Sequence, residues 1–237
     1  MLAPNRLTCL ACHAAYTSPG ELPLCRNCAD KIPWILQPRC ATCGRPETCM
    51  DCVRRKDSYF ERNRSAVSYN PQMKGWLGIY KYRGHEEMRR LIGSMLLHAY
   101  NLHKHEAVVG SADCSEMITY VPLSDKRLTE RGFNQSQQLA EELGRKTGLP
   151  VIPLLQRTRH TDKQSFKTRV DRIEDLQGVF AVDPSAKDKH KALFSSSKVT
   201  LYVVDDVYTT GSTLNECAKA IKKEFHSVDI CGISWAR

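Results

Sequence analysis

The strongest constraint on this chain is a set of eight cysteines that come in four CxxC pairs near its start. Each CxxC turn can direct two thiolates at one metal ion, and four thiolates complete a tetrahedral zinc site. The surrounding stretch is too short and too polar to build a core, so zinc binding, worth about 10–16 kcal/mol per site, would supply most of its folding free energy. We therefore predict one or two structural zinc sites in a module of residues 1–56. The predicted ligands are Cys9, Cys12, Cys25, Cys28, Cys40, Cys43, Cys49 and Cys52.

The spacing leaves open how these pairs combine. Consecutive pairing, first with second and third with fourth, is the simplest arrangement, but an interleaved cross-brace fits the same letters. Cys9–His13 (CLACH) also matches the attachment motif of c-type haem. Haem attachment normally follows export, and Met1–His13 lacks the apolar segment of a secretory signal. A thioredoxin-like redox pair would follow a strand of a βαβ unit, and none of the four pairs does.

Length and composition exclude two broad classes of protein. The chain has 237 residues, of which 41% are hydrophobic, so one large domain or two ordinary ones are expected rather than global disorder. The apolar runs are too short for a transmembrane helix. We predict a cytoplasmic protein that reaches the inner face of a membrane, if at all, through partners.

The scattered cysteines Cys114, Cys217 and Cys231 are expected to be core residues.

The positive charge is unevenly distributed. Thirty-five basic residues against 26 acidic ones leave a formal charge of +9, most of it in the first half of the chain. Such a surplus favours an acidic partner such as nucleic acid. A zinc ion with four thiolates, however, contributes about −2, so two filled sites would cancel the surplus of residues 1–56. We therefore expect any nucleic-acid contact on residues 57–112 and on the basic segment 157–172.

The rest of the chain reads as a linker and an α/β domain. Residues 57–84 hold aromatic and turn residues without a long helical period, and we interpret them as a linking β-hairpin. In residues 85–237, helical patterns at about 86–103, 134–146 and 214–221 alternate with strand patterns at 117–121, 151–155, 199–204 and 228–235. The segment VTLYVV (199–204) is apolar on both faces, which is typical of a central parallel strand. This alternation predicts a central parallel sheet flanked by helices.

The clearest chemical signal directly follows VTLYVV. Two adjacent carboxylates, Asp205 and Asp206, are placed to accept hydrogen bonds from a vicinal diol such as the ribose 2′- and 3′-hydroxyls. Next comes a loop of hydroxyl residues and a glycine at the start of a helix, where free N–H groups and the helix dipole favour a phosphate. The loop residues are Thr209, Thr210, Gly211, Ser212 and Thr213. No lysine follows the glycine, so this is not a Walker A loop; the plain alternative is a capped helix with solvated acids.

These residues carry a family resemblance. VVDDVYTTGST (203–213) resembles the phosphoribosyl pyrophosphate (PRPP) motif of type I phosphoribosyltransferases. The RGFNQ box (131–135) is similar to one in the ComF family (ComFC and GntX-like proteins), as are KYRG (81–84), the segment that begins RTR (157–159) and the four CxxC pairs. The match covers essentially the whole chain in the same order. It implies a type I phosphoribosyltransferase fold in residues 85–237 with a small N-terminal zinc-ribbon module.

The resemblance also implies roles for individual residues. Asp205 and Asp206 would be catalytic and would hold the ribose hydroxyls, while Thr209–Thr213 would hold the 5-phosphate. The implied pyrophosphate loop and hood are Pro122, Leu123, Ser124, Lys126, Arg127, Arg131, Arg157 and Arg159. Charge logic agrees, because a departing pyrophosphate needs Mg²⁺ and cations as negative charge develops on it. The plain alternatives are a simple turn at Pro122 and a solvated basic loop at 157–172, with His160 either a general base or a surface histidine.

The function implied by the resemblance is that of a phosphoribosyltransferase-like protein that binds PRPP and Mg²⁺ and serves DNA uptake in natural competence, alongside a helicase-like ATPase. The alternative is a non-catalytic scaffold that senses PRPP or binds single-stranded DNA for a competence helicase. Aromatic residues between Tyr59 and Tyr82 could stack on bases in that case, or could simply pack the hairpin on the domain. The sequence indicates no acceptor pocket and therefore no attacking nucleophile.

Overall fold

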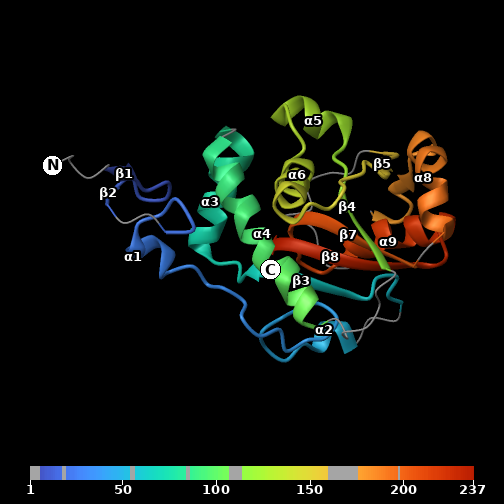
Figure 1. Cartoon of the computed structure of the whole chain (residues 1–237), viewed down its shortest axis with the longest axis horizontal. Coiled ribbons are helices and arrows are strands. Elements are labelled where there is room, and N and C mark those ends of the chain that lie inside the picture. Colours follow the sequence, from blue (N-terminus) through green and yellow to red (C-terminus); the bar gives the residue numbers. More distant parts are fainter. Residues whose placement is uncertain are drawn as a thin grey trace.

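The computed structural model describes residues 6–17, 20–53, 57–83, 86–106, 114–159, 176–196 and 198–237. Figure 1 shows an α/β domain with one cysteine-rich segment at its left and a second one below it. The first segment carries the paired strands β1 (Leu7–Thr8) and β2 (Ala15–Tyr16) and the short helix α1 (Arg26–Ala29). The second carries the short helix α2 (Met50–Val53).

Among the residues that the structure describes, four strands form the central sheet, and they run parallel in the order β3-β8-β7-β4. Their bounds are β3 (Arg62–Val67), β4 (Cys114–Tyr120), β7 (Lys198–Val207) and β8 (Val228–Ala236). The carboxyl ends of the strands therefore share one edge of the sheet, which is where ligands bind in open α/β sheets. The loop after β4 starts there beside the last residues of β7, because Val121 N donates to Val204 O at 3.0 Å.

Both faces of the sheet are buried. On β7, Tyr202 and Val204 belong to one apolar cluster, whereas Leu201 and Val203 belong to the other. The first face is covered by α3 (Pro71–Arg83), α4 (Glu86–Glu106) and α6 (Gln135–Thr147). The second is covered by α8 (Pro184–Ser196), α9 (Ser212–Glu224) and the small antiparallel sheet of β5 (Leu155–Arg157) and β6 (Phe180–Val182). The predicted α/β class, with a central parallel sheet between helices, is confirmed.

The linking hairpin predicted at residues 57–84 is wrong. β3 pairs with β8 inside the main sheet, and residues 71–83 form helix α3. The buried side chains of this helix are spaced i, i+3, i+4 and i+7, which is the pattern of an amphipathic helix. They are Met73, Trp76, Leu77 and Tyr80.

Local signals at residues 70 and 71 explain why this segment is helical. Asn70 Oδ1 accepts a hydrogen bond from Met73 N at 2.8 Å, as a capping side chain does. Pro71 follows at the first helical position, where its missing N–H costs nothing. The aromatic residues and the glycines at 75 and 78 obscured this pattern in the sequence.

The other predicted elements are present, mostly with longer bounds, but the strand predicted at Val151–Leu155 is not continuous. Val151 makes a single parallel bridge to Ile118, and β5 begins only at Leu155. Pro153 lies between them and has no N–H to donate to a neighbouring strand. Among the described residues, no helix is long and apolar enough to cross a bilayer.

The cysteine-rich segments cover the outer edge of β3. Trp34 forms an antiparallel bridge with Val67, and Ile35 N donates to Ala66 O at 3.0 Å. Further along, Asn63 N donates to Thr42 O at 2.7 Å. These contacts occupy an edge whose unpaired backbone groups would otherwise be a pairing hazard. The domain boundary at residue 56 stays a prediction, because side chains of both segments join the two apolar clusters of the sheet.

Two glycine-to-alanine substitutions test this fold. A Cβ added at Gly78, inside α3, meets nothing within 4 Å, so Gly78→Ala should raise the free energy of unfolding by about 0.5–1 kcal/mol. A Cβ added at Gly232, inside β8, would overlap Leu214 Cδ2 and lie 2.6 Å from Asn63 Oδ1. Gly232→Ala should therefore lower the free energy of unfolding by about 1–3 kcal/mol. Urea unfolding followed by tryptophan fluorescence measures both, and a destabilised Gly78→Ala would contradict the helix.

Candidate functional site

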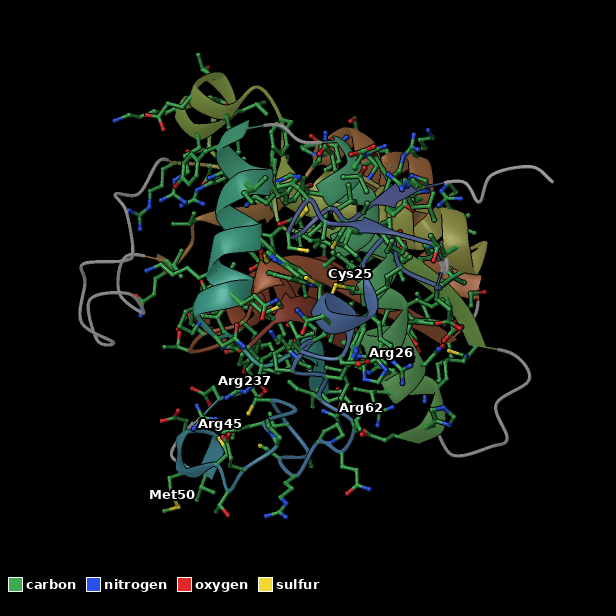
Figure 2. All side chains as sticks on the ribbon, turned by 90° about the vertical axis from the view of Figure 1, so that its left-hand side faces the viewer. Cys25, Arg26, Arg45, Met50, Arg62 and Arg237 are labelled. Atoms are coloured by element: carbon green, nitrogen blue, oxygen red, sulfur yellow. The ribbon has the colours of Figure 1, made fainter. Side chains whose placement is uncertain are left out.

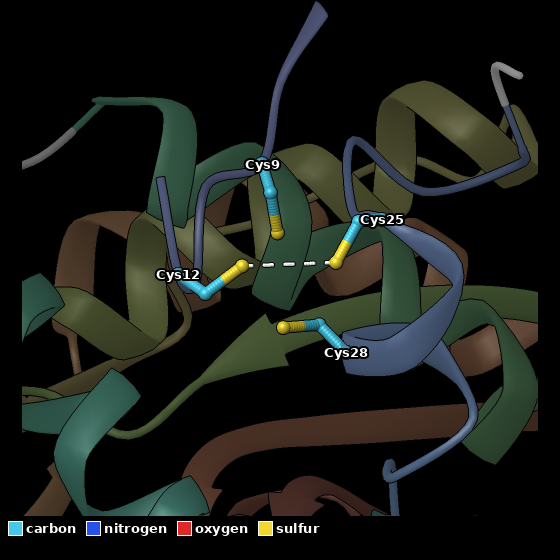
Figure 3. A group of neighbouring side chains, drawn as sticks. All are labelled: Cys9, Cys12, Cys25 and Cys28. Carbon is cyan, nitrogen blue, oxygen red and sulfur yellow. Dashed lines mark hydrogen bonds between the residues drawn. The ribbon is translucent and has the colours of Figure 1, made fainter. Parts of the chain in front are cut away.

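The eight predicted zinc ligands gather into two groups of four. Cys9, Cys12, Cys25 and Cys28 form the first group and Cys40, Cys43, Cys49 and Cys52 the second, with all sulfur atoms of a group within 4.8 Å of one another. Figure 3 shows the first group, whose thiols converge from a turn and from the start of α1. The consecutive pairing is therefore the one the structure contains, and the interleaved alternative is wrong.

The spacing of the sulfur atoms fits zinc. In a tetrahedral site with Zn–S bonds of about 2.3 Å, neighbouring sulfurs lie about 3.8 Å apart. Cys12 Sγ and Cys25 Sγ are 3.7 Å apart, and Cys43 Sγ and Cys49 Sγ are 3.6 Å apart. These distances are far longer than a disulfide bond of about 2.05 Å. Each group is thus compatible with one structural zinc ion.

A cavity of about 980 Å³ lies at the carboxyl ends of β4 and β7. Asp205 and Asp206 line it together with the loop after β7, and α5 (Asp125–Arg131) contributes from the far side of the β4 loop. Helix α3 also contributes, through side chains at positions 74, 77, 81 and 82 that share one helical face. This volume and this location are those of a small-molecule site in an α/β protein.

The two aspartates differ in their surroundings. Asp206 forms an ion pair with Lys81 of α3, whereas Asp205 Oδ1 accepts from Ser136 Oγ at 3.1 Å and from the backbone N of Asp206 at 2.8 Å. Burial, and then the neighbouring carboxylate, raise the pKa of Asp205 to about 7. Burial acts the same way on Asp206, but the Lys81 ammonium outweighs it and holds the pKa of Asp206 below its ordinary value. The pair therefore carries a full negative charge on Asp206 and a proton on Asp205 that exchanges near neutral pH.

The hydroxyl loop after β7 has the form of an anion site. Gly211 adopts a left-handed conformation (φ +78°) just before α9, and Thr210 Oγ1 lies 2.8 Å from Ser212 Oγ. Thr209, Thr210 and Thr213 line the cavity, while Gly211 lines a small pocket that adjoins it. Ser212 lines neither but bonds to Thr210. Free N–H groups at the start of a helix of this length favour a phosphate.

The predicted pyrophosphate residues divide into two sets. Leu123, Arg127 and Arg131 line the cavity, and the two arginines lie one turn apart on α5. Pro122 and Ser124 are buried within the loop, where Ser124 precedes α5, and Lys126 is exposed outside the cavity wall. Arg131 donates to Gln135 Oε1, and its guanidinium lies 5.8 Å from the centre of the Tyr82 ring. Two cations thus face the aspartates across the cavity.

The predicted hood is described only at its start. Arg157 Nε donates to Arg159 O, and Arg159 donates to Gln177 O, both at 3.1 Å. Burial, followed by the nearby Arg127 guanidinium, lowers the pKa of Arg157. Neither arginine lines the cavity. The remainder of segment 157–172, with His160, lies outside the described residues.

Several cavity residues were missed in the sequence. Lys81 belongs to the KYRG motif, but a hairpin at residues 57–84 does not predict its ion pair with Asp206, which depends on helix α3. Ser136 was missed as well, although its position just after the RGFNQ box places it at the start of α6. Arg45, Pro46 and Glu47, between the last two CxxC pairs, also line the cavity. No sequence pattern links that loop to the aspartates.

Comparison with known proteins gives a consistent set of relatives. Competence protein ComFC of Bacillus subtilis is 28% identical over 98% of this chain and 96% of its own length. Competence protein F of Haemophilus influenzae is 28% identical over 94% and 86%, and the DNA utilization protein YhgH of Escherichia coli is 28% identical over 77% of each chain. No family model matches the chain.

Among solved structures, the glutamine PRPP amidotransferase of B. subtilis complexed with ADP and GMP matches 72% of this chain and 31% of its own length. The identity is 13% and the TM-score is 0.33. This chain thus spans about a third of that protein.

The two cysteine groups predict the zinc content of the protein. The purified wild-type chain should hold two zinc ions, measured by mass spectrometry of the metal after extensive dialysis. Cys12→Ser and Cys52→Ser each remove one ligand from a different group, so each should lower the content to about one. A single substitution that removes both ions would contradict two independent sites.

The ion pair between Lys81 and Asp206 predicts a pH-dependent loss of stability. Lys81→Met leaves the buried carboxylate without its cation, so the free energy of unfolding at pH 8 should fall by about 1–3 kcal/mol. The folded-state pKa of Asp206 then lies above rather than below its unfolded value, so the loss should shrink toward pH 5, where the carboxyl group takes up a proton. Lys74→Met, an exposed lysine on the same helix, is the control. A loss that is equal at both pH values would contradict the pairing.

Proposed function

We propose, from the homology of this chain to competence proteins, that it binds PRPP together with Mg²⁺ and serves DNA uptake. The observation that supports this most directly is the convergence of three features on one cavity. These are the adjacent carboxylates near the carboxyl end of β7, the hydroxyl loop at the start of α9 and the two arginines of α5. A ribose that carries phosphate groups at two positions needs these three chemistries at one place.

In this proposal each feature binds one part of PRPP. Asp205 and Asp206 accept hydrogen bonds from the ribose hydroxyls, and the loop Thr209–Thr213 donates to the 5-phosphate through its N–H and O–H groups. Arg127 and Arg131 face the pyrophosphate. Mg²⁺ prefers oxygen ligands and usually binds through one or two carboxylates and the phosphates of the substrate, so the aspartates and PRPP together offer a suitable set. When bound, Mg²⁺ would neutralise charge on the leaving pyrophosphate.

Lys81 has a defined part in the proposal. Its ammonium offsets the negative charge of Asp206. This reduces the repulsion between the two adjacent buried carboxyl groups. Burial and the neighbouring carboxylate raise the pKa of Asp205 to about 7, so its protonation state changes near neutral pH. The proposed reaction transfers the ribosyl phosphate to an acceptor with loss of pyrophosphate. Its rate would depend on the positioning of the two reactants and on stabilisation of the charge that develops on the pyrophosphate.

A second candidate function is a non-catalytic PRPP sensor or single-stranded-DNA scaffold that works with a helicase-like ATPase. The observation that favours it is a pair of exposed tyrosines, Tyr69 and Tyr82, at the two ends of α3, with the exposed Lys74 between them. All three side chains line the cavity, and aromatic rings beside a cation suit the bases and phosphates of a single strand. Trp76 and Tyr80, two other aromatic residues between Tyr59 and Tyr82, are buried in the core and cannot contribute.

The double substitution Asp205→Asn with Asp206→Asn tests PRPP binding. Each substitution replaces one ribose-facing carboxyl oxygen with an amide NH₂ group, and the negative charge of Asp206 is lost, so calorimetry with PRPP and Mg²⁺ should detect no binding, against clear binding by the wild type. Asp188→Asn, an exposed aspartate on α8, should bind as the wild type does. Unchanged binding in the double variant would rule out this site.

An activity assay on the wild-type protein distinguishes the two candidate functions. Pyrophosphate release from PRPP is measured across a panel of amines, nucleobases and DNA ends. Release with any acceptor supports a transferase. Binding of PRPP without release across the whole panel supports the sensor.

A further inference from the structure

The cavity has a wall that PRPP binding does not use. It is built from three segments that are distant in sequence: the loop 45–47 between the last two CxxC pairs, residues 68–69 after β3, and Arg237 after β8. Lys74, near the start of α3, adjoins them. A role for this wall rests on the proposed function, because the wall borders the space next to bound PRPP.

This wall is fixed to the sheet by the second cysteine group. Arg39 N and Cys40 N both donate to Arg45 O, at 2.9 and 3.0 Å, so the loop is folded back on its own knuckle. The backbone of Gly44 has φ +71°, and a Cβ there would lie 2.6 Å from Asn63 O of β3. Arg237 then connects this loop to Tyr208, which directly precedes the hydroxyl loop Thr209–Thr213. It donates to Cys43 O at 3.4 Å, and its guanidinium lies 4.9 Å from the centre of the Tyr208 ring.

The wall lies across the cavity from the cations of α5. The carboxyl end of α3 meets α5 through the contact of Tyr82 with Arg131, whereas Tyr69, just before α3, donates its N–H to Arg237 O at 2.6 Å. In Figure 1, α5 lies at the top of the view and α2 of the second cysteine-rich segment at the bottom, and Figure 2 shows Arg45 and Arg237 together at the lower left. A nucleophile reaches the anomeric carbon from the side opposite the leaving group. With pyrophosphate at α5, that side is this wall.

The wall is positively charged. Arg45, Lys74 and Arg237 face the cavity with Glu47 as the carboxylate among them. Arg45 also lies 3.3 Å from Asp51, and both of those side chains are partly exposed, so that pair is weak. Even with Asp51 counted, the cations exceed the carboxylates. A neutral acceptor would gain nothing from this surplus, whereas an acceptor with an anionic group would.

We propose that this wall is the acceptor subsite and that it takes an amine or hydroxyl nucleophile that carries a carboxylate or a phosphate. The lone pair of the nucleophile forms the new bond to C1′ while the bond from C1′ to the pyrophosphate oxygen breaks. The pyrophosphate keeps that electron pair, and the nucleophile releases its proton to solvent water. Arg45 and Lys74 hold the anionic group and so determine specificity.

Two matched pairs of probes test the proposal: 4-aminobenzoate against aniline, and phosphoethanolamine against ethanolamine. Their affinities are measured by ligand-detected NMR on the full chain loaded with zinc, Mg²⁺ and PRPP. In at least one pair, the anionic member should bind at least about tenfold more tightly than the neutral one. The pair that shows the preference identifies carboxylate or phosphate as the anionic group.

Variants assign the preference to the wall. Arg45→Gln with Lys74→Gln should reduce it to about twofold or less while leaving the affinity for PRPP within about twofold. Arg39→Gln, which removes an exposed cation from the same knuckle outside the cavity, should preserve it. The proposal is overturned by equal binding in both pairs, by a preference that persists in the double variant, or by loss of PRPP affinity in that variant. Failure of the wild type to bind PRPP would instead refute the proposed function.

Discussion

The structure depends on how strand β3 is held on both sides. One side pairs in parallel with β8 from Arg62 to Val67, and the other is occupied by backbone groups of the two cysteine-rich segments. The buried Arg64 strengthens this junction. Its guanidinium bonds to Glu106 at the end of α4 and donates to Ala41 O at 3.0 Å beside the second cysteine group. A metal-binding segment that would have little core of its own thus gains one from the sheet, and the sheet gains a covered edge.

The same arrangement explains how the cavity acquires its walls. Parallel strands bring the aspartates and the β4 loop to one edge, which is a property of the sheet. The remaining walls come from the two segments that flank β3 in the chain: α3 supplies Lys81 to Asp206, and the second cysteine group supplies the loop at Arg45. The electrostatic balance of the aspartate pair therefore rests on a helix of the crossover between β3 and β4. The position of that helix is set by burial of Trp76 and Tyr80 against the first face of the sheet.

The sequence predicted best those features that depend on local pattern. The apolar run VTLYVV, the carboxylates after it and the glycine before α9 all have short-range signatures, and each lies where the α/β alternation placed it. The CxxC spacing likewise identified all eight cysteines, but not how they combine, because pairing depends on the path of the chain between the turns. The prediction for the segment that forms α3 was wrong for another reason. Its glycines and aromatic residues suggest turns and strands. These signals hide the helical spacing of its buried residues.

The central position of β8 has a consequence for the order of events during synthesis. β8 is made after β3, β4 and β7, yet it lies between β3 and β7. Until it leaves the ribosome, β3 has no partner on its inner side and cannot join the rest of the sheet. The cysteine groups are made first and can bind metal early, so they are the natural means to hold β3 in an extended form while the chain waits for its last strand. Pairing over such long sequence separations is slow. A nascent chain whose sheet still lacks β8 exposes unpaired strand edges and is prone to aggregation.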